Sequence, residues 1–347
     1  MRSTIPRAAC RLLAVFAAAA LTPAFAPLRA AEPSQLVRYG FAQVEMGMQF
    51  KLLLYSDGEE AANRAAAAAF DRIHQLNGIM SDYDPASELS RLSDTAGQGR
   101  VTVVSQDLWN VLVAAQQLAE RSNGAFDITV GPYVKLWRRA RREKEMPPAD
   151  RMATAREAVG SRFLKLDAAA RSVELLRPGM RLDLGGIAVG YAIDEAMSVL
   201  RGHGITRALV DGSGDIVVSD PPPGERGWRI GVAPLEAKNG PPSRYLTLAR
   251  CAVTTSGDAW QYVELDGKRY SHILDPKTGL GLTDRSLVIV VARDGMTADS
   301  LTKAVAVLGP NRGLTLVSEY PKAAALVLRP QNGKIEFEES SNFKEFE

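Results

Sequence analysis

Cysteine is almost absent from this chain of 347 residues, which contains only Cys10 and Cys251. Cys10 falls in an N-terminal segment that we expect to be removed, so a single thiol remains. One thiol excludes an internal disulfide and any metal site built from cysteines. Cys251 lies in a strand-like run, and we interpret it as a buried strand residue.

Only one apolar run is long enough to suggest a membrane or an export signal. The run LLAVFAAAALTPAFA spans 15 residues and follows Arg2, Arg7 and Arg11. It is shorter than the roughly 20 residues that a membrane-spanning helix needs, and it contains a proline. We therefore predict a cleaved secretory signal over residues 1–31 and one exported domain over residues 32–347, located in the cell envelope, in the periplasm.

An excess of positive charge is absent once this signal is set aside. The whole chain carries a formal charge of +2, and residues 1–30 contain four arginines and no acidic residue, so the remainder carries −2. One dense basic run, LWRRARREKE at 136–145, alternates with glutamate and is typical of a solvated helix end. We therefore expect no nucleic-acid partner.

The apolar patterns that are present predict an α+β fold. Residues 59–80 and 105–124 have the helical spacing of apolar side chains, and Ser105 is a candidate N-cap of the second helix. Further helices are expected at 191–204 and 297–309. Most of the C-terminal half has the pattern of strands joined by hairpins, and this segregation favours α+β over a doubly wound sheet.

A first glycine-rich junction, LDLGGIAVGYAID, runs from a strand into a helix. Free backbone N–H groups at such a helix start can bind an anion. Gly185 and Gly190 have the spacing of a P-loop, but Tyr191 and Ala192 stand where that loop needs a lysine and a hydroxyl residue, which excludes it. A tight packing turn is the alternative. The GSGD sequence at 212–215 lacks the nucleophile-elbow pattern and is expected to be a hairpin turn.

A second junction, SNGAFDITVG, places Phe126 beside Asp127 and Thr129. An aromatic ring next to a carboxylate suits a ring-shaped ligand with polar edges. It equally suits a turn with an anchoring phenylalanine, and these residues alone favour the turn.

Histidine occurs three times, and His272 is the one best placed for chemistry. It lies directly before a turn that contains Asp275, and it can face the hydroxyls of Thr254, Thr255 and Ser256, which lie one hairpin earlier. Imidazole has a reference pKa of about 6.5 and therefore suits proton transfer near neutral pH. A packed or exposed histidine without a catalytic role is the alternative.

Asp299 stands at the expected start of the last helix, in DGMTADSLTKAVAVLG. The commoner interpretation of such a carboxylate is an N-cap or compensation of the helix dipole. A ligand of a divalent cation is the alternative.

Together, these junctions indicate a family. The chain resembles the ApbE family of flavin transferases over nearly its whole mature length, from residue 44 to residue 313. The motifs that carry the resemblance are Met46-Gly47 ahead of the first expected strand, MSDYDPASELSRLS, GAFDITVGPYVKLW, LDLGGIAVGYAID, TTSGD, SHILDPKTG and ADSLTKAVAVLG. Each motif is weak alone, but seven in register are specific.

The resemblance implies a T-fold-like α+β domain that binds FAD. The residues that it implies around the flavin and adenine ends are Met46, Tyr83, Ala125, Phe126, Asp127 and Asp183. Those that it implies near the pyrophosphate are Thr255, Ser256, Gly257 and His272. It implies magnesium (Mg²⁺) at the Gly186 carbonyl, the Asp299 carboxylate and a ligand one turn later, at the position of Lys303.

The reaction that the resemblance implies moves FMN from FAD to a Thr or Ser hydroxyl of an exported flavoprotein and releases AMP. Magnesium would neutralise the pyrophosphate, and His272 would take the proton of the hydroxyl while Asp275 holds the turn. The implied partners are therefore FAD and the acceptor flavoprotein. Apart from an uncleaved signal, only that acceptor would bring the protein to a membrane.

Three positions depart from the commoner family pattern. Met48 stands where many members have threonine, Val189 replaces a frequent charged residue, and Lys303 replaces the threonine four residues after Asp299, with Thr302 one position early. Residues i and i+4 share a helix face, so the Lys303 ammonium can compete with magnesium for Asp299 or itself pair a phosphate oxygen. Three functions stay open: an FMN transferase, an FAD-binding protein without transfer, and an FAD pyrophosphatase that gives FMN and AMP.

Overall fold

The computed structural model describes residues 36–347, except for residues 233, 236–240, 243, 258–260 and 332–333. The expected secretory signal therefore lies outside the described residues. Within the described ranges, no helix is both long enough and apolar enough to cross a membrane.

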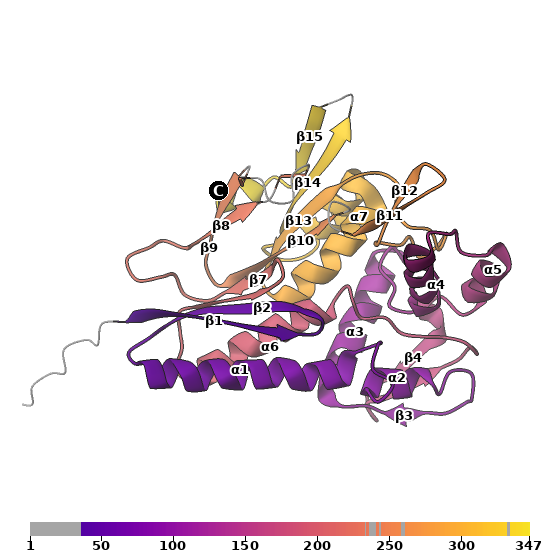
Figure 1. Cartoon of the computed structure of the whole chain (residues 1–347), viewed down its shortest axis with the longest axis horizontal. Coiled ribbons are helices and arrows are strands. Elements are labelled where there is room, and N and C mark those ends of the chain that lie inside the picture. Colours follow the sequence, from indigo (N-terminus) through magenta and orange to yellow (C-terminus); the bar gives the residue numbers. More distant parts are fainter. Residues whose placement is uncertain (1–35, 233, 236–240, 243, 258–260, 332–333) are drawn as a thin grey trace, which may run out of the picture. The chain divides into compact units, whose positions relative to one another are not determined.

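An antiparallel sheet of eight strands, in the order β1-β2-β6-β7-β10-β13-β14-β15, is the largest element of the described chain (Figure 1). The strands are β1 (Val37–Glu45), β2 (Met48–Ser56), β6 (Ala208–Gly212), β7 (Asp215–Val218), β10 (Cys251–Gly257), β13 (Leu287–Ala292), β14 (Ala324–Gln331) and β15 (Lys334–Glu339). The N-terminal hairpin joins the later strands through the β2–β6 pair, in which Phe50 lies opposite Gly212.

The sequence of β13, LVIVVA, shows why the centre of the sheet is buried on both faces. β-branched residues favour strands, and successive side chains point to opposite faces. Leu287, Ile289 and Val291 accordingly pack into one hydrophobic cluster, while Val288 and Val290 pack into another. The sheet therefore has a core on each side.

Three long helices cover one face of the sheet: α1 (Glu59–Met80), α6 (Ala188–Gly202) and α7 (Gly295–Ser318). α1 buries Phe70 and Ile73 against this core. α6 contacts both α1 and α7, and Figure 1 shows α7 running alongside β10 and β13.

α6 and α7 cross at a pair of glycines. A Cβ atom at Gly190 would collide with the carbonyl of Gly295, and a Cβ atom at Gly295 would collide with the carbonyl of Gly190. The two helix backbones therefore approach more closely than any side chain allows. This approach brings Asp299 of α7 against the first turn of α6.

The other elements complete the second core and the surroundings of the site. They are α2 (Glu88–Ser93), β3 (Thr102–Val103), α3 (Gln106–Arg121), α4 (Gly131–Glu143), α5 (Ala149–Glu157), η1 (Ser161–Phe163), β4 (Leu164–Asp167), β5 (Ser172–Leu175), β8 (Trp228–Val232), β9 (Arg244–Leu248), β11 (Tyr262–Leu265), β12 (Lys268–Ser271) and η2 (Phe343–Phe346). The β8–β9 hairpin and Phe343 pack on the far face of the large sheet. Tyr133 and Trp137 of α4 pack with the β11–β12 hairpin.

The α+β prediction is confirmed, and α1 has both predicted bounds. The N-cap prediction is also confirmed, because the side chain of Ser105 accepts a hydrogen bond from the backbone N–H of Leu108. The GSGD sequence forms the predicted hairpin turn between β6 and β7.

Three predictions are wrong. Met46-Gly47 does not precede the first strand but forms the turn between β1 and β2, because β1 is an edge strand whose exposed side chains give no clear apolar pattern. The last helix begins at Gly295 with Asp294 as its N-cap, so Asp299 lies inside the helix and is no cap. Cys251 is half-buried at the start of β10 instead of buried.

Candidate functional site

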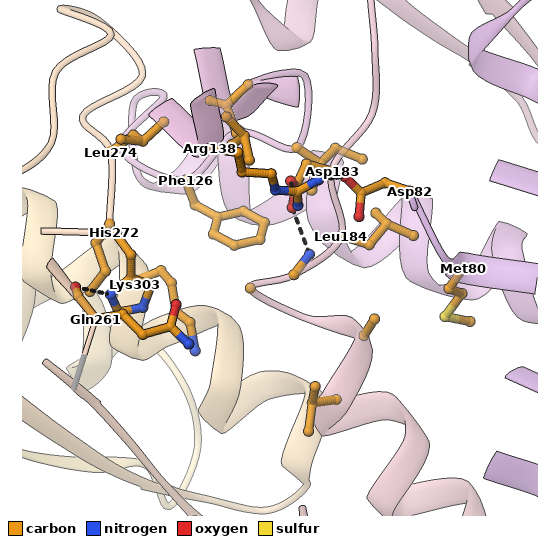
Figure 2. A pocket seen from close by; sticks show the side chains of 18 of the residues that line it. Met80, Asp82, Phe126, Arg138, Asp183, Leu184, Gln261, His272, Leu274 and Lys303 are labelled. Carbon is orange, nitrogen blue, oxygen red and sulfur yellow. Dashed lines mark hydrogen bonds and ion pairs between the residues drawn. The ribbon is translucent and has the colours of Figure 1, made fainter. Parts of the chain in front are cut away.

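A cavity of about 670 Å³ opens between the helical layer and the β11–β12 side of the chain, which is within the range of small-molecule sites. Its walls come from segments far apart in the sequence: the β1–β2 turn, the end of α1, the loops before α4 and α6, the turn after β12, and α7. Figure 2 shows His272, Gln261 and Lys303 grouped together, with Arg138, Asp82 and Asp183 in a second group.

The cavity brings together most of the residues implied by the resemblance. The implied residues that line it are Met46, Tyr83, Ala125, Phe126, Asp127, Asp183, Gly186, His272 and Lys303. The implied residues that do not line it in the described part of the chain are Thr255, Ser256, Gly257, Asp275 and Asp299.

Met46 reaches the cavity through a strained turn. Both central residues of this two-residue hairpin have positive φ, 50° at Met46 and 74° at Gly47. Tight hairpins demand this geometry, which glycine adopts easily and methionine does not. Met48, the departure from the family pattern, also lines the cavity.

The Asp127 carboxylate is occupied by its own turn. Oδ1 accepts hydrogen bonds from the backbone N–H (2.8 Å) and the hydroxyl (2.6 Å) of Thr129, and Oδ2 accepts one from the N–H of Ser161 (2.8 Å). Burial nevertheless raises the pKa of Asp127. Phe126 beside it is buried and borders the cavity, so the turn interpretation and the ring-ligand interpretation are compatible here.

The loop before α6 leaves little room for a side chain at Gly185 or Gly186. Gly185 donates its N–H to Asp183 Oδ1 at 2.9 Å, and a Cβ atom at Gly186 would lie 3.2 Å from Lys303 Cγ and 3.3 Å from the Phe126 ring. Gly190 at the start of α6 donates its N–H to Asp299 Oδ2 at 3.1 Å. That donor is therefore used inside the protein and is not free for an anion.

A buried ion pair lies on the α7 wall. The Lys303 ammonium bonds to Oδ1 of Asp299, which is fully buried. Burial alone would lower the pKa of Lys303, but the charges of Asp299 and Asp215 outweigh it and raise the pKa. Burial, together with the charge of Asp299, raises the pKa of Asp215 to about 8.

His272 is held in one orientation by the chain at Gln261. Its Nδ1 lies 3.1 Å from the carbonyl oxygen of Gln261 (Figure 2), and since a carbonyl only accepts, Nδ1 carries the proton. Nε2 of the neutral ring is therefore a proton acceptor. Burial, and then the positive charges of Lys303 and Arg141, lower the pKa of His272 to about 4. The imidazole is neutral at pH 7.

Asp275 lies in the turn that follows His272. Its Oδ1 accepts from the N–H of Lys277 at 2.9 Å, and its Oδ2 accepts from the hydroxyl of Thr278 at 3.1 Å. Its carboxylate holds the turn, and the adjacent Pro276 borders the cavity.

The described residues of the TTSGD segment, 254–257, do not line the cavity. Ser256 Oγ lies 2.7 Å from Thr302 Oγ1 in the buried contact between β10 and α7. The backbone N–H of Thr255 bonds to the Asp215 carboxylate, and a Cβ atom at Gly257 would collide with the carbonyl of Ser286. These three residues shape the β10 end instead of lining the described cavity.

Sequence reasoning missed several charged residues of the site. Arg138 and Arg141 of α4 both line the cavity, so the basic run at 136–145 is not simply a solvated helix end. Arg138 bonds to Asp82 and to Asp183, the latter at 3.0 Å. The i, i+3 spacing of the two arginines on an amphipathic helix was the signal that would have placed them on one face.

Two further residues, Asp215 and Tyr83, interact with the charged groups of the site. Asp215 was interpreted only as part of a hairpin turn, and no local pattern could have indicated its approach to Asp299. The Arg138 guanidinium lies 4.0 Å above the ring centre of Tyr83, a cation–π distance, and Tyr83 is otherwise exposed. Burial and the charge of Asp82 raise the pKa of Asp183, against the lowering effect of Arg138.

The fold and the cavity define a class of protein: an α+β domain whose helix–sheet junction encloses a site with a neutral imidazole, a fixed ammonium and an aromatic wall. The chain belongs to the ApbE family, whose model matches residues 46–327.

Known relatives resemble this protein in sequence and in structure over most of the chain. The FAD:protein FMN transferase of Treponema pallidum is 32% identical over 307 residues, covering 84% of each chain. That of Vibrio cholerae is 30% identical over 305 residues, covering 87% of this chain and 90% of its own. The solved flavin transferase ApbE from Vibrio cholerae matches with a TM-score of 0.80 at 26% identity over 90% of this chain and 100% of its own. The ApbE protein of Thermotoga maritima matches with a TM-score of 0.79 at 29% identity over 90% of this chain and 99% of its own.

Proposed function

We propose that this chain is an FAD:protein FMN transferase that moves FMN from FAD to a Thr or Ser hydroxyl of an acceptor flavoprotein and releases AMP. Family membership and the names of the relatives support the reaction class. The single observation that carries the proposal is that His272 and Lys303 border one cavity, where a proton acceptor and a fixed positive charge are available together.

The proposed step breaks one bond and forms one. The acceptor hydroxyl oxygen attacks the FMN phosphorus of FAD, the bond from that phosphorus to the bridging oxygen breaks, and AMP leaves with that oxygen. His272 Nε2 takes the hydroxyl proton, because the Gln261 carbonyl keeps Nδ1 protonated. Lys303 stabilises the negative charge that grows on the phosphate oxygens.

The magnesium ion that the resemblance implies does not fit the side chains of this site. Both oxygens of Asp299 are bonded within the protein, one of them to the Lys303 ammonium. No group of three or more His, Cys, Asp or Glu side chains suited to a metal occurs among the described residues. No step of the proposed reaction is therefore assigned to a metal.

FAD binding without transfer is the second candidate function. The observation that favours it is the Lys303–Asp299 ion pair, which takes the carboxylate that the implied metal would use. A protein that binds FAD at this cavity and lacks transfer would hold the cofactor as a reservoir. Hydrolysis of FAD to FMN and AMP, the third possibility, needs water in place of the acceptor hydroxyl.

One incubation separates these functions. The purified protein is mixed with FAD and a peptide that carries an acceptor threonine, and the peptide mass and the released AMP are followed. A peptide that gains FMN with an equal amount of AMP is the expected result. Bound FAD with neither product, while the Vibrio cholerae relative modifies the same peptide, contradicts transfer and supports the reservoir; free FMN with AMP indicates hydrolysis.

The proposal extends to the location of the protein. Residues 1–31 have the charge and apolar pattern of a secretory signal, so we place the mature protein and its acceptor in the periplasm. The expected N-terminus of the protein purified from a periplasmic fraction lies near Ala31. Recovery of the full-length chain from the cytoplasm would contradict this location.

A further inference from the structure

Lys303 lies between the buried carboxylate of Asp299 and the cavity. It follows Asp299 by one turn of α7, so both side chains lie on one helix face. The Asp299 side chain is 1% exposed, whereas that of Lys303 is 19% exposed and lines the cavity. The ammonium is thus held by Asp299, and the Lys303 side chain borders the cavity.

Each oxygen of the carboxylate behind Lys303 already has a partner within the protein. Asp299 Oδ1 is bonded to the ammonium, and Oδ2 accepts the N–H of Gly190. The glycine crossing of α6 and α7 holds this second bond in place, because no side chain separates the two helices. A divalent ion at this carboxylate would compete with a charged partner and a backbone donor.

The hydroxyl of the neighbouring Thr302 also has its hydrogen-bond partners inside the protein. Thr302 Oγ1 donates to the backbone carbonyl of Asp299 at 2.7 Å and pairs with Ser256 Oγ at 2.7 Å, in a fully buried position. It therefore points into the contact between α7 and β10, away from the cavity. Magnesium prefers about six oxygen ligands, and these side chains offer it none that is free.

The cluster of Asp299 and Asp215 already contains a cation. Asp299 and Asp215 both stabilise the Lys303 ammonium, and both lie in its electrostatic reach. A divalent ion beside this ammonium would meet a like charge at short range, where repulsion is poorly screened. Lys303 therefore disfavours a divalent ion at this cluster.

The adjacent loop makes room for the lysine. A Cβ atom at Gly186 would lie 3.2 Å from Lys303 Cγ and 3.7 Å from Cδ, closer than most side-chain contacts. The missing side chain at Gly186 lets the lysine stem lie against the loop.

We infer that Lys303 is a built-in cation that takes the place of a divalent metal ion, so that this chain binds the FAD pyrophosphate without one. An ammonium has three N–H donors; Asp299 takes one and leaves two for phosphate oxygens. The inference rests on the proposed function in naming FAD as the ligand. It does not depend on whether transfer follows.

The first test uses the unmodified protein. The protein is stripped with EDTA, and FAD affinity is measured by flavin fluorescence with and without added Mg²⁺. Since Mg²⁺ has no site to couple to, we expect the two affinities to agree within about twofold. Mg²⁺ alone should also leave the melting temperature unchanged, because only a ligand that binds the folded state raises it. A loss of FAD affinity of about tenfold or more in EDTA would overturn the inference.

Two variants at the same position sharpen the test. Lys303→Thr removes the ammonium and supplies a hydroxyl, so we expect FAD affinity in EDTA to fall at least about tenfold and to recover partly with Mg²⁺. Lys303→Arg keeps the charge and should retain FAD binding in EDTA. Equal FAD binding in EDTA by Lys303→Thr and the unmodified protein would refute the role of Lys303. Circular dichroism checks that each variant is folded, and the test on the unmodified protein needs no variant.

The two proposals fail in different ways. FAD binding in EDTA without peptide labelling or AMP release refutes the transferase and leaves the inference on Lys303 standing. Peptide labelling that requires Mg²⁺, together with Mg²⁺-dependent FAD binding, refutes the inference and leaves the transferase standing.

Discussion

The cavity has two sites where a cation meets carboxylates, and they differ in burial. On the α7 wall, Lys303 pairs with Asp299, whose side chain is 1% exposed. On the α4 wall, Arg138 bridges Asp82 and Asp183, whose side chains are 24% and 10% exposed. The chemistry is the same in both, but the carboxylates of the second are more exposed to water.

This difference in burial affects how easily each cation can exchange its carboxylate partners. Removing one partner of a buried pair leaves an uncompensated charge in a medium of low dielectric, whereas water replaces a lost partner near the surface. We therefore expect Lys303 to keep its contact with Asp299 when a ligand binds. Arg138 can exchange its contacts with Asp82 or Tyr83 for contacts with a ligand at a small cost.

The largest effect is expected from breaking the buried pair. Lys303→Met should lower the free energy of unfolding by about 3 kcal/mol, because it leaves Asp299 buried without its counter-ion. Urea unfolding measures this change. Lys165→Met, which removes an exposed pair with Glu174, is the matched control and should change little. A loss below about 1 kcal/mol would mean that the buried pair resembles a surface pair.

The next effect concerns the crossing that holds Asp299. Gly190→Ala should lower the free energy of unfolding by about 2 kcal/mol, since the added methyl group collides with the backbone of Gly295. Gly202→Ala, at the other end of α6 with open space around it, is the control. Equal stability of the two variants would show that the helices separate easily and that Asp299 is not rigidly held.

A smaller effect depends on pH and on the charge of Lys303. The pKa of His272 is about 4 in the folded chain against an ordinary 6.5, so the unfolded state binds a proton first as the pH falls. Stability from this group is present above pH 6.5 and is lost as the pH falls toward 4. Between pH 7 and pH 5 the protein should lose about 1 kcal/mol more than His272→Gln.

Proton NMR reports the same group directly. The imidazole of His272 should titrate near pH 4 in the unmodified protein and at higher pH in Lys303→Met, where one neighbouring positive charge is gone. His272→Gln identifies the resonance. Parallel stability curves, or an unchanged titration in Lys303→Met, would contradict the electrostatic coupling between the two residues.

The smallest effect is expected at the less buried site. Arg138→Met should lower the free energy of unfolding by less than about 1 kcal/mol, because water reaches Asp82 and, to a smaller extent, Asp183 once the guanidinium is gone. Urea unfolding beside Lys303→Met gives the comparison on one scale. A loss as large as that of Lys303→Met would show that the α4 wall is as permanent as the α7 wall.

Local patterns predicted much of the fold. The apolar spacing of α1 and the Ser105 cap of α3 depend on neighbours within one or two turns, and both were found as expected. The edge strand β1 was missed because its exposed side chains carry no burial signal. The prediction that a helix starts near Asp299 was wrong because it passed over Asp294, whose side chain caps α7 at Gly295.

The sequence by itself determined the family, through the order of its motifs, and it determined that Lys303 faces Asp299, because i and i+4 share a side of any helix. Only the tertiary structure decided that this pair is buried, that Arg138 turns into the cavity, and that Ser256 turns away from it. Helical spacing is a property of the local chain. Burial and charge compensation depend on segments that lie far apart in sequence and meet only when the sheet and helices pack.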